Sequence, residues 1–375
     1  MAEKKYLMVA SLQLGRTYSC YAFSTRHEFK EDPLKIHVNP VWKTNQYMSM
    51  STPTCLLLNK DKEFVAFGYE AENEYAEVIL DGETDDYYFM KSFTTLLHNN
   101  KDVTDDMIIK DVTGKTLPAS EVFRLSIKYL VSHLIQTLDK RGEGVGHEDL
   151  KWVLTIPSSW TETAKHIMKL SAEKAGIQSD HLVMVPESAS AYIYYQTLRS
   201  QDNKQKQQDG AEYMVVNLGG FAADITVIKR QNDKLIESYH TTDNSCGSTF
   251  VNKQFFHIFD EISGESVMKN LKENDPLFYL DIEREFEAVK RSIDSEMQRK
   301  ISLSIPIVAL DKIQKFTECL RKIKHLKYLN GNIAVGLLGK VFRAQLDMLI
   351  AATEHEERMA DEQKGINSKR CRESR

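Results

Sequence analysis

Two short segments, one near the start of the chain and one past its middle, constrain the fold more than any other feature. Residues 8–15 read MVASLQLG and residues 214–219 read MVVNLG. Each is an apolar strand followed by an amide residue, a leucine and a glycine that permits a turn into an outgoing strand. The copies lie on opposite sides of the polar stretch 199–212, so they predict two similar α/β lobes.

The remaining periodicity fits alternating strands and helices, as in an α/β protein. Residues 118–139 and 161–175 keep helical spacing, with Ser120 and Thr161 as predicted N-caps, and Gly176 is a predicted stop. The other predicted strands are 6–24 (two strands), 36–68 (several short ones), 152–156, 182–185, 213–216, 225–228 and 301–308, and the other predicted helices are 187–198, 249–262 and 281–299.

Composition excludes several classes of protein. The chain has 375 residues, 42% of them hydrophobic, which is enough for more than one core. A net charge of −5 argues against nucleic acid as a partner. Apolar runs are too short for a membrane span, and the first residues lack a secretory signal, so we expect no membrane partner. Five scattered cysteines without a C-x-x-C pair argue against a disulfide framework and a zinc site and favour a cytoplasmic protein.

Four ordered segments carry a resemblance to a known family. They are residues 14–24 (LGRTYSCYAFS), 152–162 (WVLTIPSSWTE), 185–195 (VPESASAYIYY) and 217–227 (NLGGFAADITV). They resemble, in turn, the first phosphate loop, the segment with Pro157 and Trp160, the connecting helix and the second phosphate loop of the 70-kDa heat shock protein family. The resemblance covers about residues 5–350 and is strongest to the divergent heat shock 70 kDa protein 12-like branch.

The resemblance implies an α/β fold of the actin-like ATPase (ribonuclease H-like) class. In that fold two lobes surround a nucleotide cleft, and the second lobe of this chain is expected to be shortened. The implied organisation is lobe I over residues 1–198, a polar hinge over 199–212, lobe II over 213–350 and a polar tail over 351–375. The implied ligand is ATP or ADP.

The same resemblance assigns roles to individual residues. Glycines of the phosphate loops let backbone N–H groups approach phosphates, carboxylates organise Mg²⁺, and a lysine and a glutamate position the attacking water. The implied catalytic residues are Glu187, Asp224 and Lys91, and the implied cofactor-binding residues are Gln13, Gly15, Arg16, Thr17, Asn217, Gly219, Gly220, Gly247 and Gly339.

The loops depart from the family pattern at named positions. Gln13 and Asn217 stand where the family has aspartates, and Arg16 replaces a threonine. Phe221 and Lys340 replace loop glycines, which agrees with the low total of 17 glycines. An amide can hydrogen-bond a metal-bound water but carries no charge, so a role for Mg²⁺ is in doubt. Arg16 could pair directly with phosphate.

Each site residue also has a purely structural alternative. Gln13 and Asn217 could be ordinary turn amides, and the loop glycines could serve hairpin turns alone. For the others the alternatives are a turn or capping residue for Asp224, a first-turn helix acid for Glu187, a solvated side chain for Lys91 and a helix cap for Gly247.

Three functional hypotheses follow. The first is an ATP-binding protein similar to the heat shock 70 kDa protein 12 branch, chaperone-like, with weak or lost hydrolysis. The second is a pseudo-ATPase that acts as an interaction or regulatory scaffold without nucleotide turnover. A sugar or acetate kinase on the same fold ranks last. The sequence leaves open whether the chain is an enzyme, and it implies protein clients or regulatory partners besides nucleotide.

Overall fold

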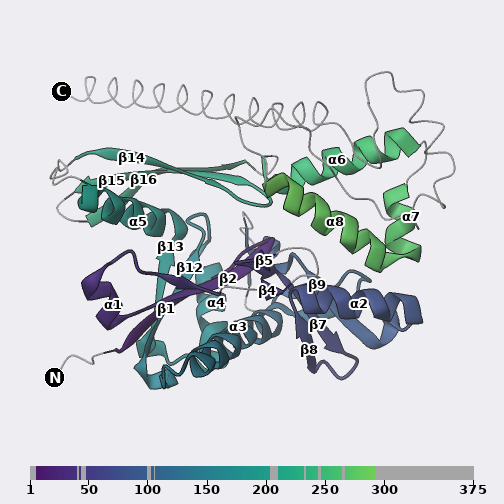
Figure 1. Cartoon of the computed structure of the whole chain (residues 1–375), viewed down its shortest axis with the longest axis horizontal. Helices are drawn as coiled ribbons and strands as arrows, with labels where there is room; N and C mark the ends of the chain where they lie inside the picture. The colour runs from purple at the N-terminus through teal and green to yellow at the C-terminus, as the bar shows by residue number, and fades with distance from the viewer. Residues whose placement is uncertain are drawn as a thin grey trace. The chain divides into compact units, whose positions relative to one another are not determined.

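A computed structural model describes most of the first three quarters of the chain (Figure 1). The described residues are 6–39, 42–43, 48–98, 103–104, 106–202, 210–231, 234–243, 246–263 and 267–291. The predicted strand 301–308, the predicted site residue Gly339 with its neighbour Lys340, and the tail 351–375 lie outside them.

The chain divides into two compact units. The first comprises Met1–Asn217, Asp224–Thr242 and Lys272–Leu280, and the second comprises Leu218–Ala223, Asp243–Leu271 and the residues from Asp281 on. The lobe boundaries expected from the sequence remain a prediction.

The central sheet of the first unit has the order β13-β12-β1-β2-β3. β1 (Met8–Leu14) runs antiparallel to β2 (Tyr18–Thr25) and parallel to β12 (Leu150–Ile156), which is parallel to β13 (Leu182–Pro186). β3 (His37–Val38) and β6 (Thr52–Pro53) each pair with β2. This order, with β2 as the antiparallel neighbour of β1, matches the predicted ribonuclease H-like topology and confirms the α/β fold class.

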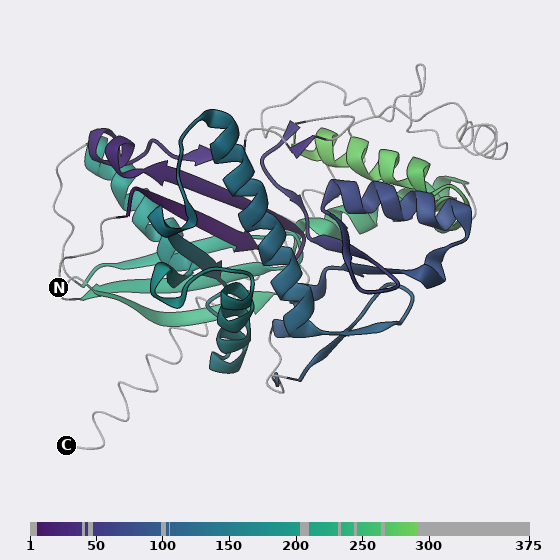
Figure 2. The ribbon, with the colours of Figure 1, turned by 90° about the horizontal axis from the view of Figure 1, so that it is seen from below.

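Alternation of side chains explains how this sheet forms. Met8, Ala10 and Leu12 of β1 are buried at every second position, and β12 repeats the pattern from Leu150 to Ile156. The long helix α3 (Ala119–Arg141) crosses β1 and β2 (Figure 2), and it also packs against α4 (Glu162–Lys174). The two helices therefore cover one face of the sheet with apolar side chains.

Local signals fixed the ends of α4 but not the start of α3. The Thr161 hydroxyl accepts a hydrogen bond from the Ala164 N–H, as predicted for an N-cap, and Gly176 follows the helix with a φ of 106°. The predicted N-cap of α3 was wrong. Pro118 holds that position in an extended conformation, and Ser120 already lies in the first turn.

A smaller sheet of order β8-β7-β9 carries the helix α2 (Tyr69–Asp81). Its strands are β7 (Cys55–Asn59), β8 (Phe64–Phe67) and β9 (Tyr87–Lys91). The remaining short elements around both sheets are α1 (Arg26–Glu31), β4 (Trp42–Lys43), β5 (Met48–Ser49), β10 (Ile108–Lys110), β11 (Thr116–Pro118) and the 3₁₀ turns Thr84–Asp86, Phe93–Leu97, His147–Asp149 and Ser179–His181. The sequence did not predict α1 or α2.

The second copy of the repeated segment also forms a hairpin. β14 (Glu212–Leu218), β15 (Ala223–Gln231) and β16 (Lys234–Asp243) form a sheet in that order, so the predicted β-turn-β units exist in both halves. The connecting helix α5 (Glu187–Asp202) packs on β12 and β13 and runs four residues beyond its predicted end at residue 198.

Three helices follow β16. α6 (Ser248–Ser263) matches its prediction, α7 (Val267–Asn274) was not predicted, and α8 (Pro276–Arg291) starts five residues before the predicted position 281. Pro276 suits the first position of a helix, where its missing N–H costs nothing. Phe255 of α6 stacks on Phe286 of α8 with ring centroids 4.0 Å apart. No helix in the described part of the chain has the length and apolarity needed to cross a membrane.

Candidate functional site

Five of the twelve predicted site residues, namely Gln13, Arg16, Glu187, Asn217 and Asp224, converge on one place in the first unit. Gln13 is the penultimate residue of β1, and Asn217 is the penultimate residue of β14. Glu187 begins α5, and Asp224 is the second residue of β15. With their direct partners they form what we call the polar cluster: Gln13, Arg16, Cys20, His98, Glu187, Asn217, Asp224 and Thr242.

The Glu187 carboxylate is held by two amides. Gln13 Nε2 donates to Glu187 Oε1 at 2.9 Å, and Asn217 Nδ2 donates to Glu187 Oε2 at 2.9 Å. Cys20 lies opposite Gln13 in the β1-β2 register, and its thiol donates to Gln13 Oε1 at 3.4 Å. This contact fixes the Gln13 amide with its nitrogen toward Glu187. Gln13 and Asn217 are thus more than turn amides, since both contact the same buried acid.

Burial is the main cause of the pKa shifts of Glu187 and Cys20. It raises the pKa of Glu187, and the negative charge of Asp224 adds to the shift, while the hydrogen bond from Gln13 opposes it. Burial and the Glu187 charge raise the pKa of Cys20 to about 11. The thiol is therefore protonated at neutral pH, as a hydrogen-bond donor to Gln13 must be.

Asp224 is the second acid of the polar cluster. Its Oδ1 accepts from the Thr242 hydroxyl at 2.6 Å and lies 3.8 Å from His98 Nε2, and its Oδ2 lies 3.7 Å from Arg16 Nη2. Burial works against ionisation of Asp224, but the hydrogen bonds from His98 and Thr242, with the charge of Arg16, outweigh it and lower the pKa. Asp224 is therefore an ionised carboxylate inside β15, not a turn or capping residue.

A buried tryptophan sets the orientation of His98. Trp160 Nε1 donates to His98 Nδ1 at 3.3 Å, and an indole can only donate, so Nδ1 is the acceptor. The ring proton therefore lies on Nε2, which faces Asp224 and the Ser159 hydroxyl at 3.4 Å. Nothing in the sequence marked His98 as a site residue, although Trp160 belongs to a segment that carried the family resemblance.

Hydroxyls continue the network beyond Asp224. Because Thr242 gives its proton to Asp224, it accepts from His240 Nε2 at 3.2 Å, and the Thr226 hydroxyl lies 3.0 Å from His240 Nδ1. A pocket beside this network is lined by Pro157, Ser158, Glu187, Ser188, Val215, Asn217, Asp224, Thr226 and His240. Its lining combines acids, hydroxyls, an amide and an imidazole.

The predicted first phosphate loop, after β1, has two features that fit a phosphate. A side chain at Gly15 would put its Cβ 2.4 Å from the Tyr18 carbonyl oxygen, so the turn requires glycine. The Thr17 hydroxyl is buried and has no hydrogen-bond partner among the described residues. Buried hydroxyls are normally satisfied, so this one fits a contact with a bound phosphate oxygen. With Arg16 between them, these residues fit a nucleotide polyphosphate.

The second phosphate loop, in the second unit, is closely packed. The Gly219 N–H closes the turn onto the Ala222 carbonyl at 2.9 Å. A Cβ at Gly247 would lie 2.1 Å from the Phe221 carbonyl carbon. The N–H groups of the first two residues of α6 donate to the carbonyls of Gly219 and Gly220. Those two donors are occupied by the chain itself, and the predicted phosphate contacts of this loop remain a prediction.

Lys91 ends β9, outside the contacts that define the polar cluster. Its ammonium forms an ion pair with Glu72 Oε1 of α2 at 3.2 Å, and 42% of its side chain is exposed. The structure thus gives Lys91 a defined partner in the β8-β7-β9 part of the first unit. Its predicted catalytic role remains a prediction.

The fold family implies Mg²⁺, but the side chains of the polar cluster do not fit it. Mg²⁺ needs oxygen ligands, usually carboxylates with open lone pairs toward its waters. Both Glu187 oxygens accept amide N–H groups, and both Asp224 oxygens face donors or a guanidinium. Over the described residues, no group of three or more His, Cys, Asp or Glu side chains is arranged to hold a metal ion.

Comparison with known proteins gives three relatives, while no protein-family model matches. The chain is 26% identical to heat shock 70 kDa protein 12A of Homo sapiens and of Mus musculus over an alignment of 371 residues, which covers 84% of this chain and 54% of each relative. It is 27% identical to heat shock 70 kDa protein 12B of Homo sapiens, covering 84% and 53%. The chain spans about half the length of these relatives. The resemblance predicted from the sequence is confirmed.

Proposed function

We propose that this chain, a divergent homologue in the heat shock 70 kDa protein 12 branch of the 70-kDa heat shock protein family, binds ATP or ADP with weak or absent hydrolysis. The observation that carries the proposal is the Glu187 carboxylate, which is held on both oxygens by the amides of Gln13 and Asn217. The fold brings Gln13, Asn217, Glu187 and Asp224 into one cluster, which supports the proposed site, and the amides hydrogen-bond the acid proposed to direct water.

Three residues of the first phosphate loop support nucleotide binding. Gly15 permits the tight turn, Thr17 has an unsatisfied buried hydroxyl, and Arg16 supplies a guanidinium that matches phosphate oxygens. We propose that this loop holds the phosphates, with Gly219, Gly220 and Gly247 of the second unit as further contacts. By the same resemblance, Gly339 belongs to the adenosine subsite.

The state of Glu187 supports weak hydrolysis. A residue that orients water or takes a proton needs a free acceptor oxygen within hydrogen-bond reach of that water. Each Glu187 oxygen already accepts one amide N–H, which lowers its capacity to accept from water, and neither Gln13 nor Asn217 supplies the negative charge of an aspartate. Loss of one preorganised stabiliser typically costs about 2.7–4 kcal/mol of transition-state stabilisation, although two such losses need not add.

A pseudo-ATPase scaffold without nucleotide turnover is the second candidate. The polar cluster satisfies its own acids, and the loop carbonyls of Gly219 and Gly220 satisfy the first N–H groups of α6. Such a fold needs no ligand to hold its loops in place. We propose a cytoplasmic, chaperone-like or regulatory setting with protein partners for either candidate.

Titration calorimetry of the full chain with ATP and ADP tests the proposal. We expect binding of both nucleotides with dissociation constants below 1 mM, and Thr17→Val should weaken binding by about tenfold because a buried hydroxyl contact is lost. Thr197→Val, at an exposed site of α5, is the matched control and should bind like the wild type. If neither nucleotide binds at millimolar concentration, the scaffold candidate replaces the proposal.

A further inference from the structure

We infer that this site binds the polyphosphate of its nucleotide without a divalent cation, and that the Arg16 guanidinium supplies the positive charge in place of the metal. The inference rests on the proposed nucleotide binding and adds to it the form of the ligand: free ATP or ADP rather than the magnesium complex. Its grounds are the oxygens that are already occupied, the balance of charge around them, and the position of Arg16.

The first ground is that hydrogen-bond donors or a guanidinium already face both acids of the polar cluster. Glu187 accepts one amide N–H on each oxygen at 2.9 Å. Asp224 accepts the Thr242 hydroxyl at 2.6 Å on Oδ1 and faces Arg16 with Oδ2. A cation bound at either acid would lie beside the amide N–H groups or the guanidinium, which turn positive charge toward it. The donor set therefore favours an anion over a cation.

The second ground is the charge already present in the polar cluster. Arg16 lies against Asp224, and both side chains are nearly buried, with 11% and 14% of their surface exposed. His98 accepts from Trp160 on Nδ1 and turns its Nε2–H toward Asp224. The guanidinium therefore faces the charge of Asp224, while the amides of Gln13 and Asn217 face Glu187. The cluster thus already places a fixed cation beside one of its two acids.

The third ground is the position and chemistry of Arg16. It stands between the glycine that makes the turn and the unsatisfied hydroxyl of Thr17. Its Nη2 lies 3.7 Å from Asp224 Oδ2, so the guanidinium is placed beside the acids of the cluster. A guanidinium presents several donors in a plane and binds phosphate oxygens in pairs, which a single metal-bound water does not.

The test measures affinity with and without the metal. Calorimetry of the full chain with ATP and with ADP is run once in EDTA and once in excess Mg²⁺. We expect dissociation constants that differ by less than fivefold between the two conditions. Tightening of either nucleotide by more than fivefold in Mg²⁺ overturns the inference while leaving nucleotide binding intact. Absence of binding in both conditions overturns the proposed function itself.

Variants of Arg16 then separate charge from structure. In EDTA, Arg16→Thr should weaken ATP binding on the order of tenfold to a hundredfold, because charge-assisted hydrogen bonds are lost. Arg16→Lys should recover part of the affinity. Adenosine, which lacks phosphates, should bind the wild type and Arg16→Thr equally. Arg26→Thr, at the exposed start of α1, is the matched control and should bind ATP as the wild type does.

Folding is checked by circular dichroism before these affinities are compared. If Arg16→Thr does not fold, the comparison of Arg16→Lys with the wild type in EDTA decides. A loss of affinity that is the same for ATP and adenosine overturns the role of Arg16, because a phosphate contact must distinguish the two ligands. Unchanged ATP affinity in Arg16→Thr overturns it equally.

Discussion

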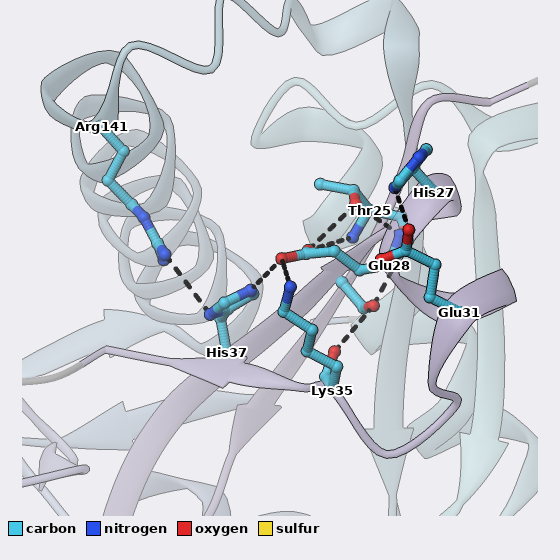
Figure 3. Close-up of polar contacts among 8 residues, drawn as sticks. Thr25, His27, Glu28, Glu31, Lys35, His37 and Arg141 are labelled. Atoms are coloured by element: carbon cyan, nitrogen blue, oxygen red, sulfur yellow. Dashed lines mark hydrogen bonds and ion pairs between the residues drawn. The ribbon is translucent and has the colours of Figure 1, made fainter.

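Glu28 and Glu187 are two acids of the first unit that each accept several hydrogen bonds, yet their pKa values shift in opposite directions. The Glu28 side chain of α1 accepts from the Thr25 hydroxyl at 2.9 Å and from His37 Nε2 at 2.8 Å, and it pairs with the Lys35 ammonium at 3.1 Å (Figure 3). These bonds, with that from His37 first, lower the pKa of Glu28 to about 2. Glu187 accepts only neutral amides, and burial raises its pKa.

The difference shows that the number of donors does not decide the state of an acid. Glu28 lies near solvent beside an ammonium and an imidazole, so its charged form is favoured twice, by hydration and by its partners. Glu187 is removed from solvent, and the hydrogen bonds that it accepts come from the neutral amides of Gln13 and Asn217. An acid of the second kind can sit in a phosphate site without a neutralising metal, and the predictions below test this contrast.

The largest expected effect comes from placing charge beside Glu187. Gln13→Asp with Asn217→Asp replaces both amide donors by acids, so the buried carboxylates repel one another and the unfolding free energy should fall by about 3–5 kcal/mol without metal. Mg²⁺ should restore stability, since the rebuilt acids can organise it, and Mg²⁺-dependent ATP hydrolysis should appear. Thermal unfolding with EDTA or Mg²⁺ and phosphate release measure the two effects.

The single variants Gln13→Asp and Asn217→Asp are the controls for that experiment. Each removes one amide donor, and each should show a smaller loss of stability and a weaker response to Mg²⁺ than the pair. A double variant as stable as the wild type in EDTA would contradict the role given to the amides. A double variant that responds to Mg²⁺ but hydrolyses no ATP would point to Phe221 or to the region around Gly339 as a further block.

The predictable part of this site was local in sequence. The resemblance assigned Gln13, Asn217 and Glu187 to the site, and the patterns that carry it are local: an apolar strand before a glycine turn for the two amides, and a strand before a helix for Glu187. The same locality explains the correct cap at Thr161. At the start of α3, residue type alone favoured Ser120 as the N-cap, whereas Pro118 holds that position.

The sequence could not predict which side chains from distant segments contact one another. His98 follows a 3₁₀ turn, Trp160 precedes α4, and Thr242 lies in β16, and none of them shares a spacing pattern with Asp224. The sequence also could not predict which end of each amide, the oxygen or the nitrogen, faces Glu187. An amide offers both a donor and an acceptor, and only the position of Cys20 and Glu187 decides which end faces the acid.

Removing the acid gives the next largest effect. Glu187→Ala leaves two buried amide donors, on Gln13 and Asn217, without an acceptor, and we expect a loss of about 2–4 kcal/mol in the unfolding free energy. Glu187→Gln keeps one acceptor oxygen and should cost about half as much or less. Urea unfolding at pH 7 measures both. Equal losses for the alanine and glutamine variants would mean that the amides do not depend on Glu187.

The smallest expected effect is the loss of stability in Glu28→Gln, and this loss should decrease as the pH falls. Its folded pKa of about 2 lies below the unfolded value of about 4.3, so its contribution is fully present above pH 5 and declines as the pH falls toward 2. Because the group is near the surface, we expect Glu28→Gln to cost only about 1 kcal/mol at pH 7. Urea unfolding of both proteins between pH 7 and pH 3.5 should show this difference shrinking. A difference that stays constant over that range would contradict the lowered pKa of Glu28. The loss of stability in Glu187→Gln should not decrease in the same way, since burial disfavours the charged form of Glu187.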